Sequence, residues 1–118
     1  MNNSLTRFER IRIVLVALLF INTPRTESFN CWAFVRHVFR LARIKECKYF
    51  KNISKKEAEN PPFGEVIFLL EKGVRNKRWS HVVITLPFGY VVHMSYYWGM
   101  KVTITPLSEI WDLYNPSI

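Results

Sequence analysis

The sequence predicts an α+β fold in which helices precede a small antiparallel β-sheet. Residues 31–42 carry apolar side chains at helical spacing, and residues 11–21 form an apolar run before them. After residue 64 the apolar segments are short, rich in β-branched residues and separated by turn residues. With 118 residues, of which 49% are hydrophobic and 15% aromatic, the chain can bury one core. We therefore expect a single domain over residues 1–118.

The predicted elements follow one another with few interruptions. The polar, Lys- and Glu-rich residues 51–62 are expected to form a surface connection between the helices and the sheet. The predicted helices cover residues 7–21, 30–44 and 107–114, and the predicted strands cover 65–70, 80–86, 90–95 and 101–105.

The first helix has two interpretations. Residues 11–21 are apolar and follow Arg7 and Arg10, as in a signal peptide. However, Arg12 interrupts the apolar run, no small-residue cleavage site follows, and the run is short for a membrane span. We favour a core helix without a stable membrane span, and an export signal is the alternative.

Cys31 lies at the predicted start of the second helix. Asn30 is a good N-cap residue, so Cys31 falls in the first turn, where free N–H groups and the helix dipole favour a thiolate. The apolar face of this helix includes Cys31, so its thiol points inward. This pattern fits a nucleophilic cysteine, and the alternative is a buried structural one.

Two histidines lie on a predicted β-hairpin. The strands 80–86 and 90–95 flank a short connection that contains a proline and a glycine. Pairing Leu86 with Tyr90 places His81 and His93 on one face as diagonal neighbours, whose backbones are about 7–8 Å apart across the two strands. A register shift of one residue would separate them. A thiol beside such a pair has the nucleophile, base and orienting group of a catalytic triad.

Four motifs together resemble the NlpC-type cell-wall peptidases, which are compact relatives of the papain-like cysteine peptidases. Residues 30–35, Asn-Cys-Trp-Ala-Phe-Val, are similar to the start of the family's catalytic helix, in the Trp-containing form common in phage-tail members. Residues 64–68 resemble the family's next strand, residues 81–84 its base-carrying strand, and residues 92–94 the strand of its third catalytic residue. The resemblance extends from about residue 7 to about residue 113.

This resemblance implies a papain-like (NlpC-like) fold and a cysteine endopeptidase or amidase that acts on peptidoglycan stem peptides. In the family the cleaved bond commonly follows D-glutamate. Cys31 would attack the scissile carbonyl, His81 would accept and return the proton, and His93 would orient His81. No cofactor is implied.

The Trp-containing motif, the small size and the lack of a convincing export signal indicate a phage virion or tail hydrolase. Its partners would be phage tail proteins, and it would reside in the virion or in the host cytoplasm before delivery to the wall. Export is the less favoured location. A second hypothesis is a catalytically silent tail or assembly protein that keeps the fold.

One departure from the family affects the active site. Many members carry a tyrosine before the cysteine whose hydroxyl lies in the active site, and here Arg25 occupies that position. Oxyanion stabilisation could come from Arg25, Thr26, Tyr96 or the backbone N–H of Cys31, and the sequence does not decide among them.

Aromatic residues complete the predicted substrate site. Trp79 precedes the base strand and Trp98 follows the third-residue strand, so both are candidates to line the cleft together with Arg25 and Tyr96. The alternative for the tryptophans is an aromatic core or its rim.

The charge balance suits an anionic partner, because 17 basic residues against 9 acidic ones give a net charge of +8. Cell wall and nucleic acid both fit, but no nucleic-acid-binding motif is present, so that function rests on charge alone. Cys31 and Cys47 do not form a metal-binding spacing with each other or with the three histidines. We expect no metal site and two free cysteines.

Overall fold

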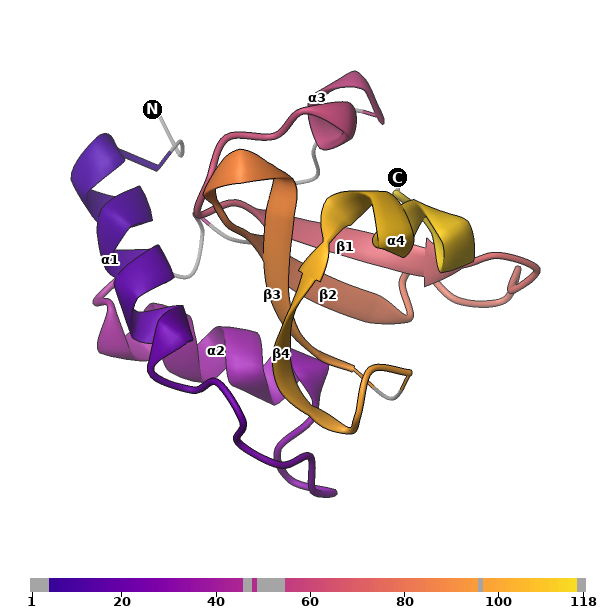
Figure 1. Ribbon diagram of the computed structural model, residues 1–118, viewed down its shortest axis with the longest axis horizontal. Helices are drawn as coiled ribbons and strands as arrows, with labels where there is room; N and C mark the ends of the chain where they lie inside the picture. The colour runs from indigo at the N-terminus through magenta and orange to yellow at the C-terminus, as the bar shows by residue number, and fades with distance from the viewer. Residues whose placement is uncertain (1–4, 46–47, 49–54, 96, 117–118) are drawn as a thin grey trace.

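The computed structural model describes residues 5–45, 48, 55–95 and 97–116. All seven predicted elements form, with ends that shift by up to three residues (Figure 1). The elements are α1 (Arg7–Leu18), α2 (Cys31–Leu41), α3 (Lys55–Glu59), β1 (Val66–Glu71), β2 (His81–Thr85), the 3₁₀ turn η2 (Pro87–Gly89), β3 (Tyr90–Ser95), β4 (Lys101–Pro106), α4 (Leu107–Leu113) and β5 (Tyr114–Pro116).

The sheet has five strands in the order β4-β3-β2-β1-β5, and every neighbouring pair is antiparallel. Helices α1 and α2 lie on one side of the sheet and α4 on the other (Figure 1). Because side chains alternate along a strand, Val82 and Ile84 pack toward the helices α1 and α2, whereas Val83 packs toward α4. The central strand β2 is consequently buried along its whole length.

Helix α1 covers the core with one face, in line with the interpretation favoured from the sequence, and exposes the other. Thr6 and Glu9 form a capping box at its start, and Ile13 and Ala17 are fully buried against the rest of the core. The helix ends at Leu18, three residues earlier than predicted. Within the described residues, no helix combines the length and the apolar character that a membrane crossing requires.

Helix α1 is fixed to the start of β1. The guanidinium of Arg10 lies 3.1 Å from the carboxylate of Glu65 and also donates to the carbonyl of Phe63 at 3.1 Å. Gly64 has a φ of +72°, and a Cβ there would lie 2.8 Å from the Arg10 carbonyl oxygen. Only glycine therefore fits this close approach.

The β2–β3 hairpin has the predicted register. Ile84 pairs with Val92 and Thr85 with Val91, and the Leu86 N–H donates to the Tyr90 carbonyl at 2.7 Å. His81 and His93 therefore extend from the same face of the sheet, which is the face opposite α2.

Two elements differ from the sequence prediction. Residues 55–59 form α3 inside the predicted surface connection, and Ala58 of this helix is fully buried. Residues 114–116 form β5, where the predicted last helix ran to residue 114. Tyr114 leaves the helix because it pairs with Glu71 on β1, and such a long-range contact has no local signal in the sequence.

Candidate active site

Cys31 is the first residue of α2 and is buried against the start of β2. The side chain of Asn30 accepts a hydrogen bond from the Ala33 N–H at 3.0 Å, so the predicted N-cap is confirmed. Backbone N–H groups of Val82, Trp32 and Cys31 itself act on the thiol sulfur and lower its pKa. The sulfur is thus surrounded by donors from two elements.

The predicted lowering of the thiol pKa is wrong. Burial raises the pKa of Cys31 above its ordinary value, and this effect is larger than the opposing ones from the backbone N–H groups and the Arg25 charge. The helix start does act in the expected direction. Its effect is overcome because burial removes most of the thiol from water, so Cys31 rests as a neutral thiol.

The two histidines are in direct contact. His81 Nε2 lies 2.8 Å from His93 Nδ1, and both side chains are buried. The contact follows from the hairpin register, which places the two residues diagonally on neighbouring strands. His81 thereby uses Nε2 within the protein, and Nδ1 is the ring nitrogen left for other partners.

A third polar side chain continues this contact. His93 Nε2 lies 2.9 Å from Thr105 Oγ1 on β4, and Thr105 is buried as well. The sequence analysis did not identify Thr105, since a threonine in a predicted strand is ordinary. The sequence offered one indication of its role: the predicted strand that contains Thr105 directly follows the strand that carries His93.

Both histidines are neutral near pH 7. The pKa of His81 is lowered to about 3, first by burial, then by repulsion from His93 and from Arg25. Burial lowers the pKa of His93 to about 4. A neutral imidazole is a proton acceptor, so His81 has the protonation state that a general base requires.

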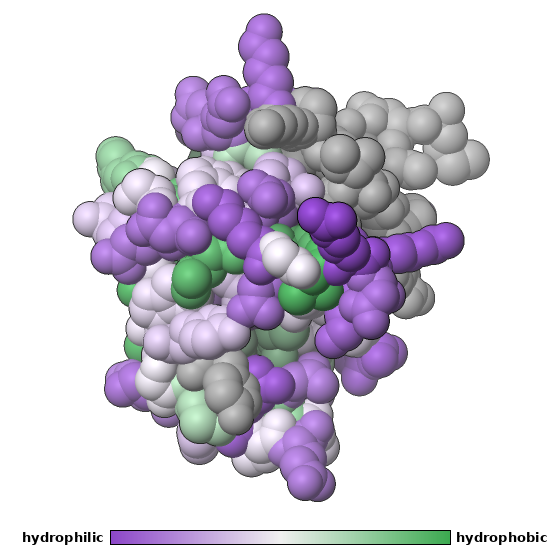
Figure 2. Space-filling view, turned by 90° about the vertical axis from the view of Figure 1, so that its right-hand side faces the viewer, coloured by the Kyte–Doolittle hydropathy of each residue, from purple (hydrophilic) through white to green (hydrophobic). Residues whose placement is uncertain are grey.

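Cys31 and His81 line one pocket of about 220 Å³. His93 lies behind His81 and does not reach the pocket. The lining residues are Arg25, Cys31, Glu71, Lys77, Ser80, His81, Tyr97 and Tyr114. Hydrophilic side chains dominate the side of the molecule that carries the β1–β2 connection, and hydrophobic surface is confined there to small areas (Figure 2).

Arg25, which was predicted to belong to the substrate site, lines this pocket. Its backbone N–H donates to the Met100 carbonyl at 2.7 Å, which ties the segment before α2 to the turn before β4. Thr26 instead stabilises a local turn, because its hydroxyl accepts from the Phe29 N–H at 3.0 Å.

The two predicted tryptophans lie outside this pocket. Trp79 packs against Trp32 and Phe68, with ring centroids 5.9 and 5.5 Å away, and Trp98 packs edge-on against His93 at 5.1 Å. Neither tryptophan lines the pocket that contains Cys31. Tyr96, the remaining predicted substrate residue, lies outside the described residues.

Two tyrosines that the sequence analysis missed line the pocket instead. The ring of Tyr114 stacks on His81 with centroids 5.2 Å apart, and burial raises the pKa of its hydroxyl, which stays protonated. Tyr97 donates a hydrogen bond to Glu71. The pocket thus combines the cations Arg25 and Lys77 with one carboxylate.

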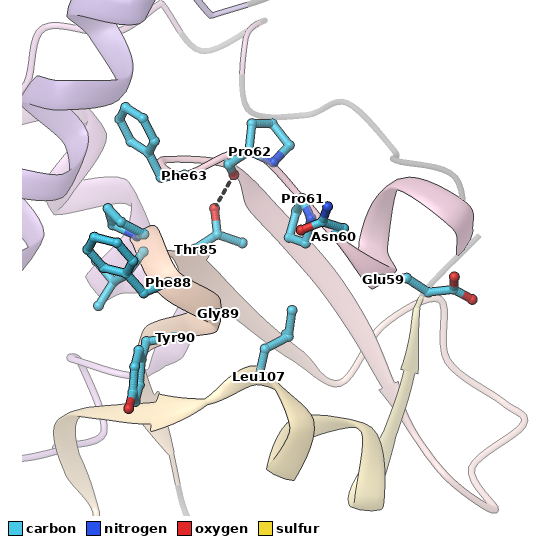
Figure 3. Close-up of a pocket in the computed structure, with 12 residues that line it drawn as sticks. Glu59, Asn60, Pro61, Pro62, Phe63, Thr85, Phe88, Gly89, Tyr90 and Leu107 are labelled. Carbon is cyan, nitrogen blue, oxygen red and sulfur yellow. Dashed lines mark hydrogen bonds between the residues drawn. The ribbon is translucent and has the colours of Figure 1, made fainter.

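A larger cavity of about 480 Å³ lies at the other end of β2, beside the 3₁₀ turn (Figure 3). Thr85 closes part of it by donating to the Pro62 carbonyl at 2.7 Å. None of the predicted site residues lines it. In the described part of the chain, no three His, Cys, Asp or Glu side chains are grouped to hold a metal ion. Cys47 lies outside that part.

Comparisons with known proteins identify the fold. No protein-family model matches the sequence, and no curated protein does. Among solved structures, the NlpC/p60 domain of the peptidoglycan hydrolase SagA has a TM-score of 0.67 and 20% identity, over 92% of this chain and 98% of that chain. A protein of the NLP/P60 family from Staphylococcus aureus, described as similar to lipoprotein, has a TM-score of 0.65 and 19% identity, over 98% of this chain and 43% of that chain. The chain therefore has the fold of an NlpC/p60 domain, and the predicted fold class is confirmed.

Proposed function

We propose that this protein is a cysteine endopeptidase or amidase that cleaves peptidoglycan stem peptides. The main support is geometric: a thiol at a helix start and a neutral histidine line one pocket, and a second histidine holds the first at 2.8 Å. The similarity of the fold to the NlpC/p60 domain of a peptidoglycan hydrolase supports the substrate class.

In this mechanism the reaction begins from a neutral thiol and a neutral imidazole. His81 Nδ1 takes the Cys31 proton as the sulfur attacks the scissile carbonyl, and a C–S bond forms. The imidazolium then returns the proton to the leaving amine, and the C–N bond breaks. Water, activated by His81, hydrolyses the thioester and releases the second product. His93 keeps the imidazole ring in place throughout.

Two groups are placed to stabilise the oxyanion. The backbone N–H of Cys31 is at the free N-terminal end of α2. The positive charge of Arg25 acts on both Cys31 and His81. Arg25 thus takes over, with a charge, the role proposed for the tyrosine hydroxyl at this position in the resembled family.

The polar pocket suits a charged peptide better than an apolar one. Arg25 and Lys77 are complementary to substrate carboxylates, and Glu71 is complementary to an ammonium group. Short peptides that carry D-amino acids and free carboxylates have this charge pattern. The net charge of +8 further favours association with an anionic wall.

The direct test is digestion of purified sacculi, with the released fragments identified by mass spectrometry. Wild-type protein is expected to release stem-peptide fragments. Cys31→Ala is expected to lower the rate by about 10³-fold or more, since no neighbouring group replaces the nucleophile. Cys47→Ser is the matched control and should keep the wild-type rate.

The second candidate is a silent phage-tail or assembly protein. It is favoured by the raised pKa of the Cys31 thiol and by the arginine at the position of the family's tyrosine. Wild-type protein that binds sacculi but releases no fragment, together with normal function of Cys31→Ala, would decide for this alternative.

Association with a phage particle is a separate proposal. It rests on the Trp-containing motif at residues 30–35. If it holds, proteomics of purified particles from the source organism should detect this chain with tail proteins. Its presence in the membrane and wall fractions of cells without particles would contradict the proposal and favour export.

A further inference from the structure

Three buried side chains on three neighbouring strands form a continuous hydrogen-bonded chain. It runs from His81 on β2 to His93 on β3 over 2.8 Å and from His93 to Thr105 on β4 over 2.9 Å. The three residues are between 0 and 4% exposed, so water does not substitute for these contacts. Only the His81 end reaches the pocket that contains Cys31.

Each neutral imidazole carries one ring proton, so the chain has only two possible proton orders. In the first, His81 and His93 both carry their proton on Nε2. His81 then donates to His93, His93 donates to the Thr105 oxygen, and His81 Nδ1 has a free lone pair. In the second, Thr105 donates to His93, His93 donates to His81, and His81 Nδ1 carries a proton.

The first order is the one that lets His81 accept the proton of Cys31, as the proposed function requires. Backbone N–H groups of Val82, Trp32 and Cys31 already act on the sulfur, so the thiol hydrogen needs an acceptor elsewhere. In the shared pocket His81 offers that acceptor only when its Nδ1 is unprotonated. In the second order His81 Nδ1 carries a proton, and the imidazole has no lone pair to offer in this pocket.

We propose that Thr105 is a positioning residue that fixes the tautomers of both histidines by accepting the proton of His93 Nε2. The proposal is built on the two hydrogen bonds of the chain, and the choice between the two orders rests on the proposed function, in which His81 accepts the thiol proton.

Aromatic neighbours hold the two rings in the orientation that this relay needs. Tyr114 stacks on His81 with an interplanar angle of 26°, and Trp98 meets His93 edge-on with an angle of 60°. Ring flips are thereby opposed, and Thr105 Oγ1 remains the partner of His93 Nε2.

The test compares Thr105→Val, which keeps the β-branched shape and removes the hydroxyl, with Thr105→Ser, which keeps the hydroxyl. Ring-¹⁵N-labelled histidine gives NMR shifts that report which nitrogen of each ring is protonated. Wild-type and Thr105→Ser proteins should show both rings protonated on Nε2. In Thr105→Val, both rings should switch to Nδ1 protonation, because a buried N–H without a partner is costlier than a bare lone pair.

Kinetic measurements distinguish a role of Thr105 in positioning the histidines from a role in stabilising the fold. Thr105→Val should lower kcat on the order of 10²-fold, which is the size of a general-base contribution. It should leave KM unchanged, because Thr105 does not line the pocket. Thr105→Ser should restore kcat to within a few-fold of wild type. A thermal melt that matches wild type should accompany the loss.

Two NMR results would overturn the inference: wild-type His81 protonated on Nδ1, or unchanged tautomers in a folded Thr105→Val protein. If Thr105→Val does not fold, Thr105→Ala and Thr105→Ser form the same comparison. If wild-type protein releases nothing from sacculi, the proposed function fails, and the NMR result still decides the tautomer assignment.

Discussion

The reactivity of Cys31 depends on the balance between its burial and the donors around it. Backbone N–H groups and the charge of Arg25 lower the pKa of the thiol, and removal from water raises it by more. His81 is neutral for the same reason. Under the proposed function, the thiolate of Cys31 would therefore be generated by proton transfer at the moment of attack, as in a serine hydrolase.

This balance predicts the pH dependence of thiol alkylation. The rate of iodoacetamide labelling at Cys31 should rise with pH and reach half its maximum above the ordinary thiol value of 9.0. Removing the nearby charge in Arg25→Met should move that midpoint to still higher pH, and Arg25→Lys should leave it near wild type. Mass mapping after labelling measures the rate. Fast labelling that is already maximal at pH 6 would contradict the neutral resting thiol.

At this scale the sequence identified candidate side chains from local patterns, but it did not indicate their protonation states. Cys31 and the two histidines were identified from local patterns, namely a helix cap and a hairpin register. The pKa direction, Thr105 and Tyr114 were missed because burial and contacts between distant strands depend on the folded chain.

The hairpin of β2 and β3 is the element that assembles the site. Its register was predictable because the turn between Leu86 and Tyr90 is short and both strands are apolar on one face. In contrast, α3 and β5 were not predictable. Pairing of residues 114–116 with β1 stabilises an extended segment that is too short to show a pattern of its own.

The turn between β2 and β3 contains a residue with a strained backbone, Phe88. Phe88 has a φ of +67° and is 97% exposed, so its side chain contributes little to packing while its backbone is disfavoured. Phe88→Gly should be more stable than Phe88→Ala by about 1 kcal/mol, because only glycine relieves the strain. Urea unfolding of both variants measures the difference. Equal stabilities would mean that the turn does not hold this conformation.

For the molecule as a whole, two buried neutral histidines make stability depend on pH. Their pKa values fall from 6.5 in the ordinary state to about 3 and about 4 in the folded protein. As pH falls below 6.5 the unfolded chain binds protons before the folded one does, so the free energy of unfolding decreases. The decrease is about 1 kcal/mol per histidine per pH unit.

Denaturant unfolding between pH 7 and 4.5 measures this loss. His93→Gln should show about half the wild-type slope, because one of the two buried histidines is then absent. A free energy of unfolding that stays constant over this range in the wild type would contradict the burial of the pair in a neutral state.

Under the proposed function, Cys31 and His81 act as one catalytic unit in an NlpC/p60 fold. Initial rates of fragment release from sacculi test it most directly when wild type is compared with Cys31→Ala, His81→Ala and the double variant. Because neither the thiol nor the imidazole can accelerate the reaction without its partner, we expect both single variants and the double variant to share the same residual rate. That rate should be about 10³-fold or more below wild type. A His81→Ala protein that keeps the wild-type rate, or a double variant whose loss is the product of the two single losses, would contradict the account.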